Sequence, residues 1–301
     1  MKSKDRKIYF YGWYFRCQSE EGTAAVIPAI HLSEGKQTCS IQVITEKGAW
    51  DQEYPAEQFR ISAKGLLMCI GENVFSEKGI RLNMQAGETA IRGSLRFGPF
   101  ARPAHDIMGP FQYLPRMECR HAVYSMLHEV NGQLSIGSHQ LSFRRGLGYM
   151  EGDSGTSFPQ RYVWTQHFLE DDSFQGDDVS ESPLKGKGSL MLAAAKIPLG
   201  PCRFMGTIGL VRLGEKEYRF ATYLGAVIEN MNQELVIRQG RYRLTAKCLE
   251  PERKFLYAPC NGAMSRKIGE NVSGKAEFFL TRGDSVLLQV KTDRAAFESE
   301  L

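Results

Sequence analysis

Apolar and polar residues alternate along much of the chain with a period of two, which is the pattern of β-strands. Residues 38–45, TCSIQVIT, show it most clearly, and residues 7–17 are rich in aromatic, β-prone residues. Gly, Asn or charged residues separate most of the short runs, so the pattern predicts an antiparallel meander that closes into a barrel or a sandwich. The other predicted strands are 23–31, 59–61, 66–70, 73–75, 80–85, 89–97, 117–130, 133–136, 139–145, 161–169, 189–196, 204–213, 217–224, 235–239, 242–249, 275–281 and 286–290.

The second half of the chain repeats the rhythm of the first, so two stacked barrels or one large curved sheet would both satisfy the number of strands. Residues 117–130 fit a helix as well as a strand. The Asn131-Gly132 dipeptide that follows favours the strand, because it is typical of tight hairpin turns. We expect a closing helix at residues 294–301.

Two segments are predicted to be loops. Residues 97–115 hold four prolines, which excludes a regular strand or a long helix and makes this loop a candidate lid. Residues 170–188 are acidic and polar, as expected of a solvated loop. A calcium loop is the alternative there, but the spacing of the acids does not fit an EF-hand.

The segment 146–166, GLGYMEGDSGTSFPQRYVWTQ, carries the main candidate chemistry. Glu151 and Asp153 are two residues apart, so their carboxyls share one face of an extended chain. Aromatic residues surround them at Tyr149, Phe158, Tyr162 and Trp164. Carboxyls among aromatics suit an acid site over an apolar pocket, although an edge turn with solvated acids would use the same residues.

Composition narrows the class of protein. The chain has 301 residues, 42% of them hydrophobic, which is enough for a large core. Its 38 basic and 34 acidic residues leave a net charge of only +4, and no Lys/Arg run is interleaved with aromatics, so we expect no nucleic-acid partner. The seven cysteines form no C-x-x-C pair, which indicates reduced thiols in a cytoplasmic protein.

The sequence shows no apolar run near the ~18 residues of a membrane span and no apolar region of a signal peptide. A small basic cluster opens the chain at Lys2, Lys4, Arg6 and Lys7. It suits either a solvated terminus or peripheral contact with an anionic membrane surface.

Other chemistries find little support in the sequence. The tetrapeptide GDSG at 152–155 resembles the nucleophile segment of serine proteases, with Ser154 as nucleophile, but no histidine has the usual upstream context. A metal would need His121 with Glu151 or Cys119, and no H-x-x-x-H pair exists. We therefore expect no metal and no cofactor. The remaining hypothesis is that the protein binds a hydrophobic small-molecule substrate and carries out cofactor-free acid–base chemistry.

Residues 9–16, YFYGWYFR, resemble the Y-F-E-G-W-Y-F-K opening of the tocopherol cyclase-like family. Similar segments follow in the same order over almost the whole chain. They are 25–30 (AVIPAI), 107–109 (IMG), 115–121 (PRMECRH), Ser125-Met126 with His128, 148–159, 162–166, 195–198 (AKIP) and 218–226 (YRFATYLGA). This family is related to the carotenoid hydratases and to two-domain lipocalin-like proteins.

The resemblance implies an all-β chain of two lipocalin-like antiparallel β-barrel domains, which we place at residues 1–165 and 166–301. It also implies a cofactor-free cyclisation, in which the phenol of a prenylated quinol adds to a double bond of its own side chain. Hydration of a similarly hydrophobic substrate is the related reaction. A non-catalytic lipocalin-like carrier is the alternative.

Glu151 matches the family's acid, and burial would keep it un-ionised at neutral pH. His121 or Asp153 would take the phenol proton. The expected substrate-binding residues are Trp13, Tyr14, Tyr124, Trp164 and Gln166. Among them, the ring faces of Trp13, Tyr14 or Trp164 would stabilise a developing cation. The chain departs from the family at Tyr11, where Glu is usual, and at Ser154, where Trp is usual.

Overall fold

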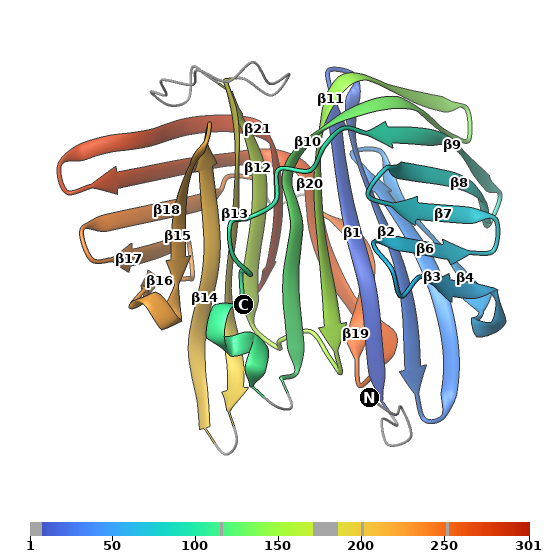
Figure 1. The fold of residues 1–301 in the computed structure, drawn as a ribbon, viewed down its shortest axis with the longest axis horizontal. Coiled ribbons are helices and arrows are strands. Elements are labelled where there is room, and N and C mark those ends of the chain that lie inside the picture. The colour runs from blue at the N-terminus through green and yellow to red at the C-terminus, as the bar shows by residue number, and fades with distance from the viewer. Residues whose placement is uncertain (1–7, 115–116, 171–185, 200–201, 251–252) are drawn as a thin grey trace. The chain divides into compact units, whose positions relative to one another are not determined.

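The computed structural model describes residues 8–114, 117–170, 186–199, 202–250 and 253–301 (Figure 1). It divides into two compact units, and neither is continuous in the sequence. The first unit consists of Met1–Arg102, Cys119–Phe158 and Leu256–Lys267, and the second of Pro103–Glu118, Pro159–Phe255 and Ile268–Leu301. The domain limits 1–165 and 166–301 stay a prediction about folding units.

The first unit is an antiparallel sheet of eleven strands in the order β4-β3-β2-β1-β11-β10-β9-β8-β7-β6-β5. Strand β4 contacts β8 and β3 contacts β6, so the sheet curves into a nearly closed barrel. The strands are β1 (Tyr9–Ser19), β2 (Gly22–Ser33), β3 (Lys36–Thr45), β4 (Gly48–Pro55), β5 (Phe59–Ile61), β6 (Leu67–Ile70), β7 (Asn73–Ser76), β8 (Gly79–Ala86), β9 (Thr89–Phe97), β10 (Cys119–Ile136) and β11 (His139–Gly155).

Alternate residues of these strands fill the barrel. On β1, Trp13, Phe15 and Cys17 belong to the buried core, and the Phe15 ring stacks on Phe75 at 6.2 Å and on Phe97 at 5.9 Å. Each fully buried aromatic side chain contributes roughly 1.5–3 kcal/mol by leaving water. The barrel interior is therefore a packed hydrophobic core.

The second unit is built on a curved sheet in the order β15-β14-β13-β12-β21-β20-β18-β17-β16, with β19 pairing to β20 (Figure 1). Strand β14 contacts β16, and a second hydrophobic core includes Val163, Leu192 and Phe278. The strands of this sheet are β12 (Tyr162–Glu170), β13 (Lys187–Leu199), β14 (Cys202–Leu213), β15 (Lys216–Ala221), β16 (Val227–Asn230), β17 (Leu235–Gln239), β18 (Tyr242–Cys248), β19 (Lys254–Cys260), β20 (Ala263–Arg282) and β21 (Ser285–Glu300). Most of β19 and the start of β20 belong to the segment Leu256–Lys267 of the first unit.

The all-β prediction is confirmed, because the helices among the described residues are short 3-10 turns: η1 (Ala56–Gln58), η2 (Gly109–Tyr113) and η4 (Thr222–Leu224). The predicted helix at 294–301 is wrong. Strand β21 runs through it, with Ala295 and Phe297 alternating into the core of the second unit. Pairing with β12 outweighs local propensity there.

The predicted hairpin at Asn131-Gly132 is also wrong. Strand β10 continues through it with a register shift between Val130 and Gly132, and the chain turns only at Gly137. Gly132 has φ of 135°, a conformation that glycine adopts readily, so it makes a bulge in place of a turn. The strands that the pattern missed are β4, β16, β19 and the start of β20.

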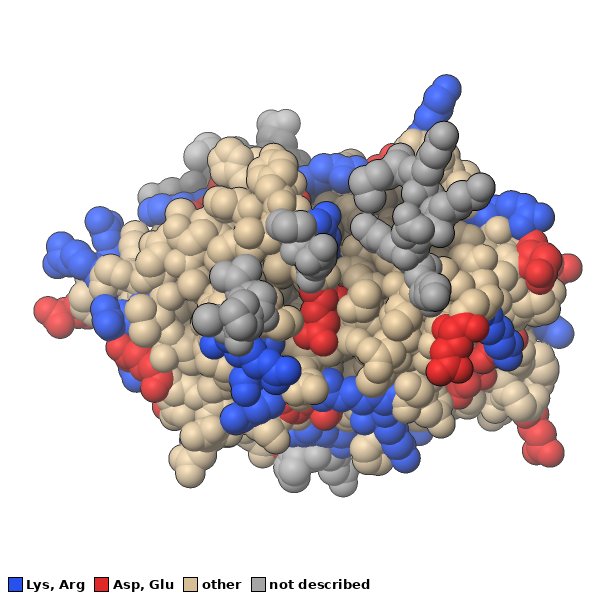
Figure 2. Space-filling view, turned by 90° about the horizontal axis from the view of Figure 1, so that it is seen from below, with Lys and Arg blue, Asp and Glu red and all other residues tan. Residues whose placement is uncertain are grey.

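Of the predicted loop 97–115, the described residues 97–114 leave the sheet as predicted, apart from the end of β9 and a bridge between Ala101 and Leu127. The predicted loop at 170–188 lies mostly outside the described residues. No helix in the described part of the chain is long and apolar enough to cross a membrane. On the face shown in Figure 2, Lys and Arg are interspersed with Asp and Glu, as the small net charge suggests.

Candidate active site

The site residues lie on one face of β11, where the segment 146–155 alternates strictly. Met150 points into the barrel and belongs to its core, so Tyr149, Glu151 and Asp153 point to the outer face. Glu151 lies directly opposite Tyr14 of β1. Although outside the barrel, Glu151 is only 5% exposed. The expectation that Glu151 and Asp153 share a face is confirmed.

Strand β10 adds His121, which is the direct cross-strand partner of Asp153. Its Nδ1 lies 2.9 Å from Oδ1 of Asp153, and its Nε2 lies 3.2 Å from Oε2 of Glu151. The first contact is a hydrogen bond, and the second is an ion-pair distance without hydrogen-bond alignment. One imidazole therefore bridges two carboxylates that are both mostly shielded from water.

Two further side chains contact this cluster. The Tyr149 hydroxyl donates to Oε2 of Glu151 at 2.5 Å, and the Cys119 thiol lies 3.5 Å from Oδ1 of Asp153. Burial and the neighbouring Glu151 carboxylate hold the pKa of Tyr149 well above its usual value, so this phenol stays a donor. Glu151 is thus contacted on one oxygen by both Tyr149 and His121.

The electrostatics of the cluster favour a proton on His121. Burial by itself would lower the pKa of this imidazole, but the charges of Glu151 and Asp153 and the contacts to them raise it well above its usual value of 6.5. The two neighbouring carboxyl groups therefore favour the protonated form of His121. The expectation that Glu151 is un-ionised stays a prediction.

His121, Glu151 and Asp153 could also supply metal ligands, since one donor atom of each lies within 4.8 Å of the others. Two carboxylates and one imidazole are a usual set for a divalent transition metal. Here, however, the two ring nitrogens each face a different carboxylate. To bind a metal ion, the imidazole would have to give up its contact with one of the two carboxyl groups. The arrangement therefore fits a protonated histidine better than a set of metal ligands.

The other predicted residues are distributed over both faces and both units. Tyr14 lies directly opposite Glu151 on the neighbouring strand. Trp13 and Tyr124 pack on the interior side, with ring centroids 6.4 Å apart, so they do not share the face of Glu151. Trp164 and Gln166 lie on β12 in the second unit, both buried, and Gln166 donates to Ser189 at 3.2 Å.

The two departures from the family pattern are direct neighbours. Tyr11 and Ser154 are cross-strand partners between β1 and β11, on the interior side with Trp13. A large residue thus stands opposite a small one, and neither shares the face of Glu151. The same placement removes the base that a Ser154 nucleophile would need, because His121 lies on the other face.

Two cavities occur elsewhere among the described residues. One of about 250 Å³ in the second unit is lined by residues that include Val163, Leu235 and Phe297. Another of about 320 Å³ in the first unit is lined by Tyr54, Arg92 and neighbours. Neither is lined by His121, Glu151 or Asp153.

Sequence reasoning missed Tyr149 as a functional contact and Arg16 entirely. Arg16 is the cross-strand partner of Tyr149, is fully buried, and donates to Gln18 at 2.9 Å. The sequence does contain a pattern that points to them. Polar residues alternate on β1 at Tyr14, Arg16 and Gln18. They alternate in the same way on β11 at Tyr149, Glu151 and Asp153. Extending the period of two to both strands would have found them.

No protein-family model matches the chain, and no curated protein matches it significantly in sequence. Solved structures do match its fold. An AttH-type protein of Nitrosomonas europaea superposes with a TM-score of 0.55 at 9% identity, over 99% of this chain and 94% of that one. CghA with Sch210972 gives 0.55 at 10% identity, over 98% and 89%.

Kievitone hydratase from Nectria haematococca gives a TM-score of 0.53 at 5% identity, over 96% of this chain and 88% of that one. Identities this low carry an argument about fold alone. These structures match over nearly the full length of both chains, which puts both units of this protein in the fold that they share.

Proposed function

We propose that this protein is a cofactor-free enzyme that adds an O–H group across a carbon–carbon double bond of a hydrophobic substrate. The hydroxyl is either a phenol of the same molecule, which gives cyclisation of a prenylated quinol, or a water molecule, which gives hydration. The observation that carries the proposal is the buried cluster in which His121 bridges Glu151 and Asp153. The fold shared with a hydratase and the resemblance to the cyclase-like family support it.

In the proposed reaction the cluster first delivers a proton. The proton held on His121 passes to Glu151, which transfers it to one alkene carbon and leaves a tertiary cation on the other. The two carboxylates supply negative charge beside that cation in a site with little water, where such charge acts most strongly. Tyr14, opposite Glu151, can add the face of its ring.

The second half of the reaction returns the proton. The phenol or water oxygen bonds to the cation, and its proton passes to Nε2 of His121, the nitrogen that gave up its proton in the first step, while the Nδ1–H stays hydrogen-bonded to Asp153. The cluster ends with the proton it began with, and the substrate has gained one C–H and one C–O bond at the expense of one C=C and one O–H bond. No electron acceptor is needed for this balance.

The test is incubation of the purified protein with a prenylated hydroquinone in D₂O, followed by mass spectrometry. Cyclisation keeps the mass of the substrate apart from one deuterium bound to carbon, and hydration adds one water in addition. Glu151→Gln is expected to lower turnover about 10²- to 10⁴-fold, the usual value of a general acid, while substrate still binds. Glu129→Gln, a carboxyl on β10 outside the cluster, is the control.

A non-catalytic carrier is the second candidate. The 250 Å³ cavity in the second unit favours it, although this volume suits a ligand much smaller than a prenylquinol. Native mass spectrometry of the protein from cells separates the two hypotheses. A bound lipid that stays chemically unaltered after long incubation, with no deuterium incorporated, would support the carrier and contradict the enzyme.

A further inference from the structure

Three arginines lie next to one another on the outer wall of the first unit, where β8 and β9 pair. Arg81 of β8 lies directly opposite Ser94 of β9, and Arg92 and Arg96 lie two residues to either side of Ser94. All three are exposed, while Leu95, between Ser94 and Arg96, is buried in the core. Diagonal neighbours in an antiparallel pair are about 7–8 Å apart, so the three long side chains can reach one point above Ser94. We call Arg81, Arg92 and Arg96 the arginine triangle.

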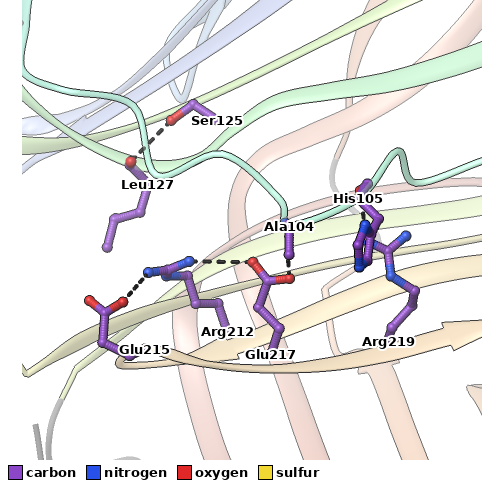
Figure 3. A network of polar contacts seen from close by, with 8 residues as sticks. All are labelled: Ala104, His105, Ser125, Leu127, Arg212, Glu215, Glu217 and Arg219. Atoms are coloured by element: carbon purple, nitrogen blue, oxygen red, sulfur yellow. Dashed lines mark hydrogen bonds and ion pairs between the residues drawn. The ribbon is translucent and has the colours of Figure 1, made fainter.

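The charge of the arginine triangle is not balanced within the described part of the chain, where its side chains form neither an ion pair nor a hydrogen bond. Arg212 of β14, in the second unit, shows the contrast, because it pairs with Glu215 at 3.2 Å and with Glu217 at 3.3 Å (Figure 3). Like charges on neighbouring strands repel one another. An anion bound between the three arginines would remove that repulsion.

The acidic side chains that border the arginine triangle have other partners. They are Glu72, which accepts from Asn83, Glu77, which pairs with Arg102, and Glu129, which lies 3.7 Å from Arg145. The centre of the triangle offers hydrogen-bond donors instead. Gln133 of β10 is the cross-strand partner of Ser94, and its Oε1 accepts from Gln140 at 2.7 Å. The amide NH₂ of Gln133 and the hydroxyl of Ser94 are therefore available to an anion.

A cavity of about 320 Å³ adjoins the arginine triangle, because Arg92 lines both. The other lining residues come from β4 and β8 and are Gln52, Tyr54, Asn83, Met84 and Gln85. The lining thus combines amides, one phenol, one thioether and one cation, without a carboxyl group. Polar groups of this kind orient the uncharged part of a small ligand, and the volume lies within the range of small-molecule sites.

We propose that this outer wall of β8 and β9 binds a small molecule that carries phosphate groups. The arginine triangle holds the phosphate, because a guanidinium donates two parallel N–H bonds to a pair of phosphate oxygens. The cavity beside Arg92 holds the uncharged remainder of the ligand. The site shares no residue with the cluster of His121, Glu151 and Asp153, so the proposal goes beyond the function proposed above and does not depend on it.

The test is a titration of the purified protein with inorganic pyrophosphate, followed by calorimetry and by NMR of the arginine Nε–H groups. The signals of the arginine triangle should shift. Arg81→Gln, Arg92→Gln and Arg96→Gln should each weaken binding about five- to tenfold, because one charge-assisted contact is lost. Arg60→Gln is the control, since this exposed arginine of β5 contacts only nearby backbone carbonyls.

A substitution at the centre of the triangle gives a second, independent test. Ser94→Asp should place a carboxylate among the three arginines, where it takes the position of the ligand. It should raise the midpoint of urea unfolding and weaken pyrophosphate binding about tenfold or more. Ser94→Asn, which has nearly the same size and no charge, should change neither quantity. This pair of variants decides the matter if an arginine variant does not fold.

Pyrophosphate binding that is equal in the wild type, Arg92→Gln and Ser94→Asp would overturn the proposal. An absence of pyrophosphate binding at physiological salt, together with tight binding of a short RNA or of phosphatidylglycerol vesicles, would also overturn it, because the wall would then be a surface for a macromolecule or a membrane. None of these readouts needs turnover. The outcome is therefore separate from whether the protein catalyses the proposed addition.

Discussion

The two faces of strand β11 carry different kinds of side chain. On the interior face, Gly148, Met150, Gly152 and Ser154 stand opposite Cys17, Phe15, Trp13 and Tyr11 of β1. On the outer face, Tyr149, Glu151 and Asp153 are buried or half-buried polar groups that contact one another or His121. Small residues dominate the first face, and titratable ones the second.

The difference shows how packing and chemistry can be encoded in one strand without conflict. Inside, large rings from β1 and β10 need small partners: a Cβ on Gly152 would lie 2.9 Å from both Trp13 and Tyr124. Outside, burial raises the cost of each polar group unless a partner satisfies it, and the cluster supplies those partners. Substitutions on the outer face should therefore lower activity, and substitutions on the interior face should lower stability.

The largest effect is expected from Asp153→Asn on the outer face. The amide cannot hold the imidazolium as the carboxylate does, so kcat should fall about 10²-fold or more, with little change in fold. Ser154→Ala, the next residue on the interior face, should leave kcat unchanged. Steady-state kinetics with circular dichroism measures both, and equal losses from the two variants would contradict the separation of faces.

Gly152→Ala, on the interior face, should destabilise the fold. The added methyl has no room between Trp13 and Tyr124, and overpacking of this kind costs about 1–3 kcal/mol of unfolding free energy. Urea denaturation measures it, with Ser142→Ala on the same strand as the control. An unchanged midpoint would mean that the interior face is not tightly packed.

The His121 cluster should make stability depend on pH. The folded-state pKa of His121 is raised, so its contribution is complete below about pH 6.5 and is lost as the pH rises toward that higher pKa. Within that window the unfolding free energy should fall by at most about 1.4 kcal/mol per pH unit.

His121→Gln should remove this slope. Burial lowers the pKa of His31 to about 4 and of His128 to about 3, so both act mainly below about pH 7, where they make stability rise with pH; their effect has the opposite sign and cannot produce the predicted fall. Denaturant titrations at several pH values from 6 to 9 test the prediction. A slope that persists in the variant would assign it to another group.

The smallest effect concerns the Tyr11–Ser154 pair. Because a large and a small residue face each other, Tyr11→Ser and Ser154→Tyr should each destabilise the protein, and the exchanged pair should regain part of the loss. A coupling energy of about 0.5–1 kcal/mol is expected from a double-mutant cycle. Strict additivity would show that the two departures from the family pattern are independent.

Much of this site could be predicted from residues 146–155 alone. The period of two places Glu151 and Asp153 on one face in any regular strand, and that prediction is confirmed. The same rule on β10 places His121 correctly but fails after Val123, since the two register shifts change which residues face each way. Nothing in the apolar pattern signals a bulge whose cause is pairing with a distant strand.

The sequence by itself determined that the chain is all-β, and that one strand carries two carboxyls on a common face. Only the tertiary structure decided that this face lies outside the barrel, that one histidine bridges both carboxylates, and that Tyr11 and Ser154 lie behind them. The reason is that alternation is a local property of the chain. Which side of a strand is inside, and which residue lies opposite, depends on register and closure between segments far apart in sequence.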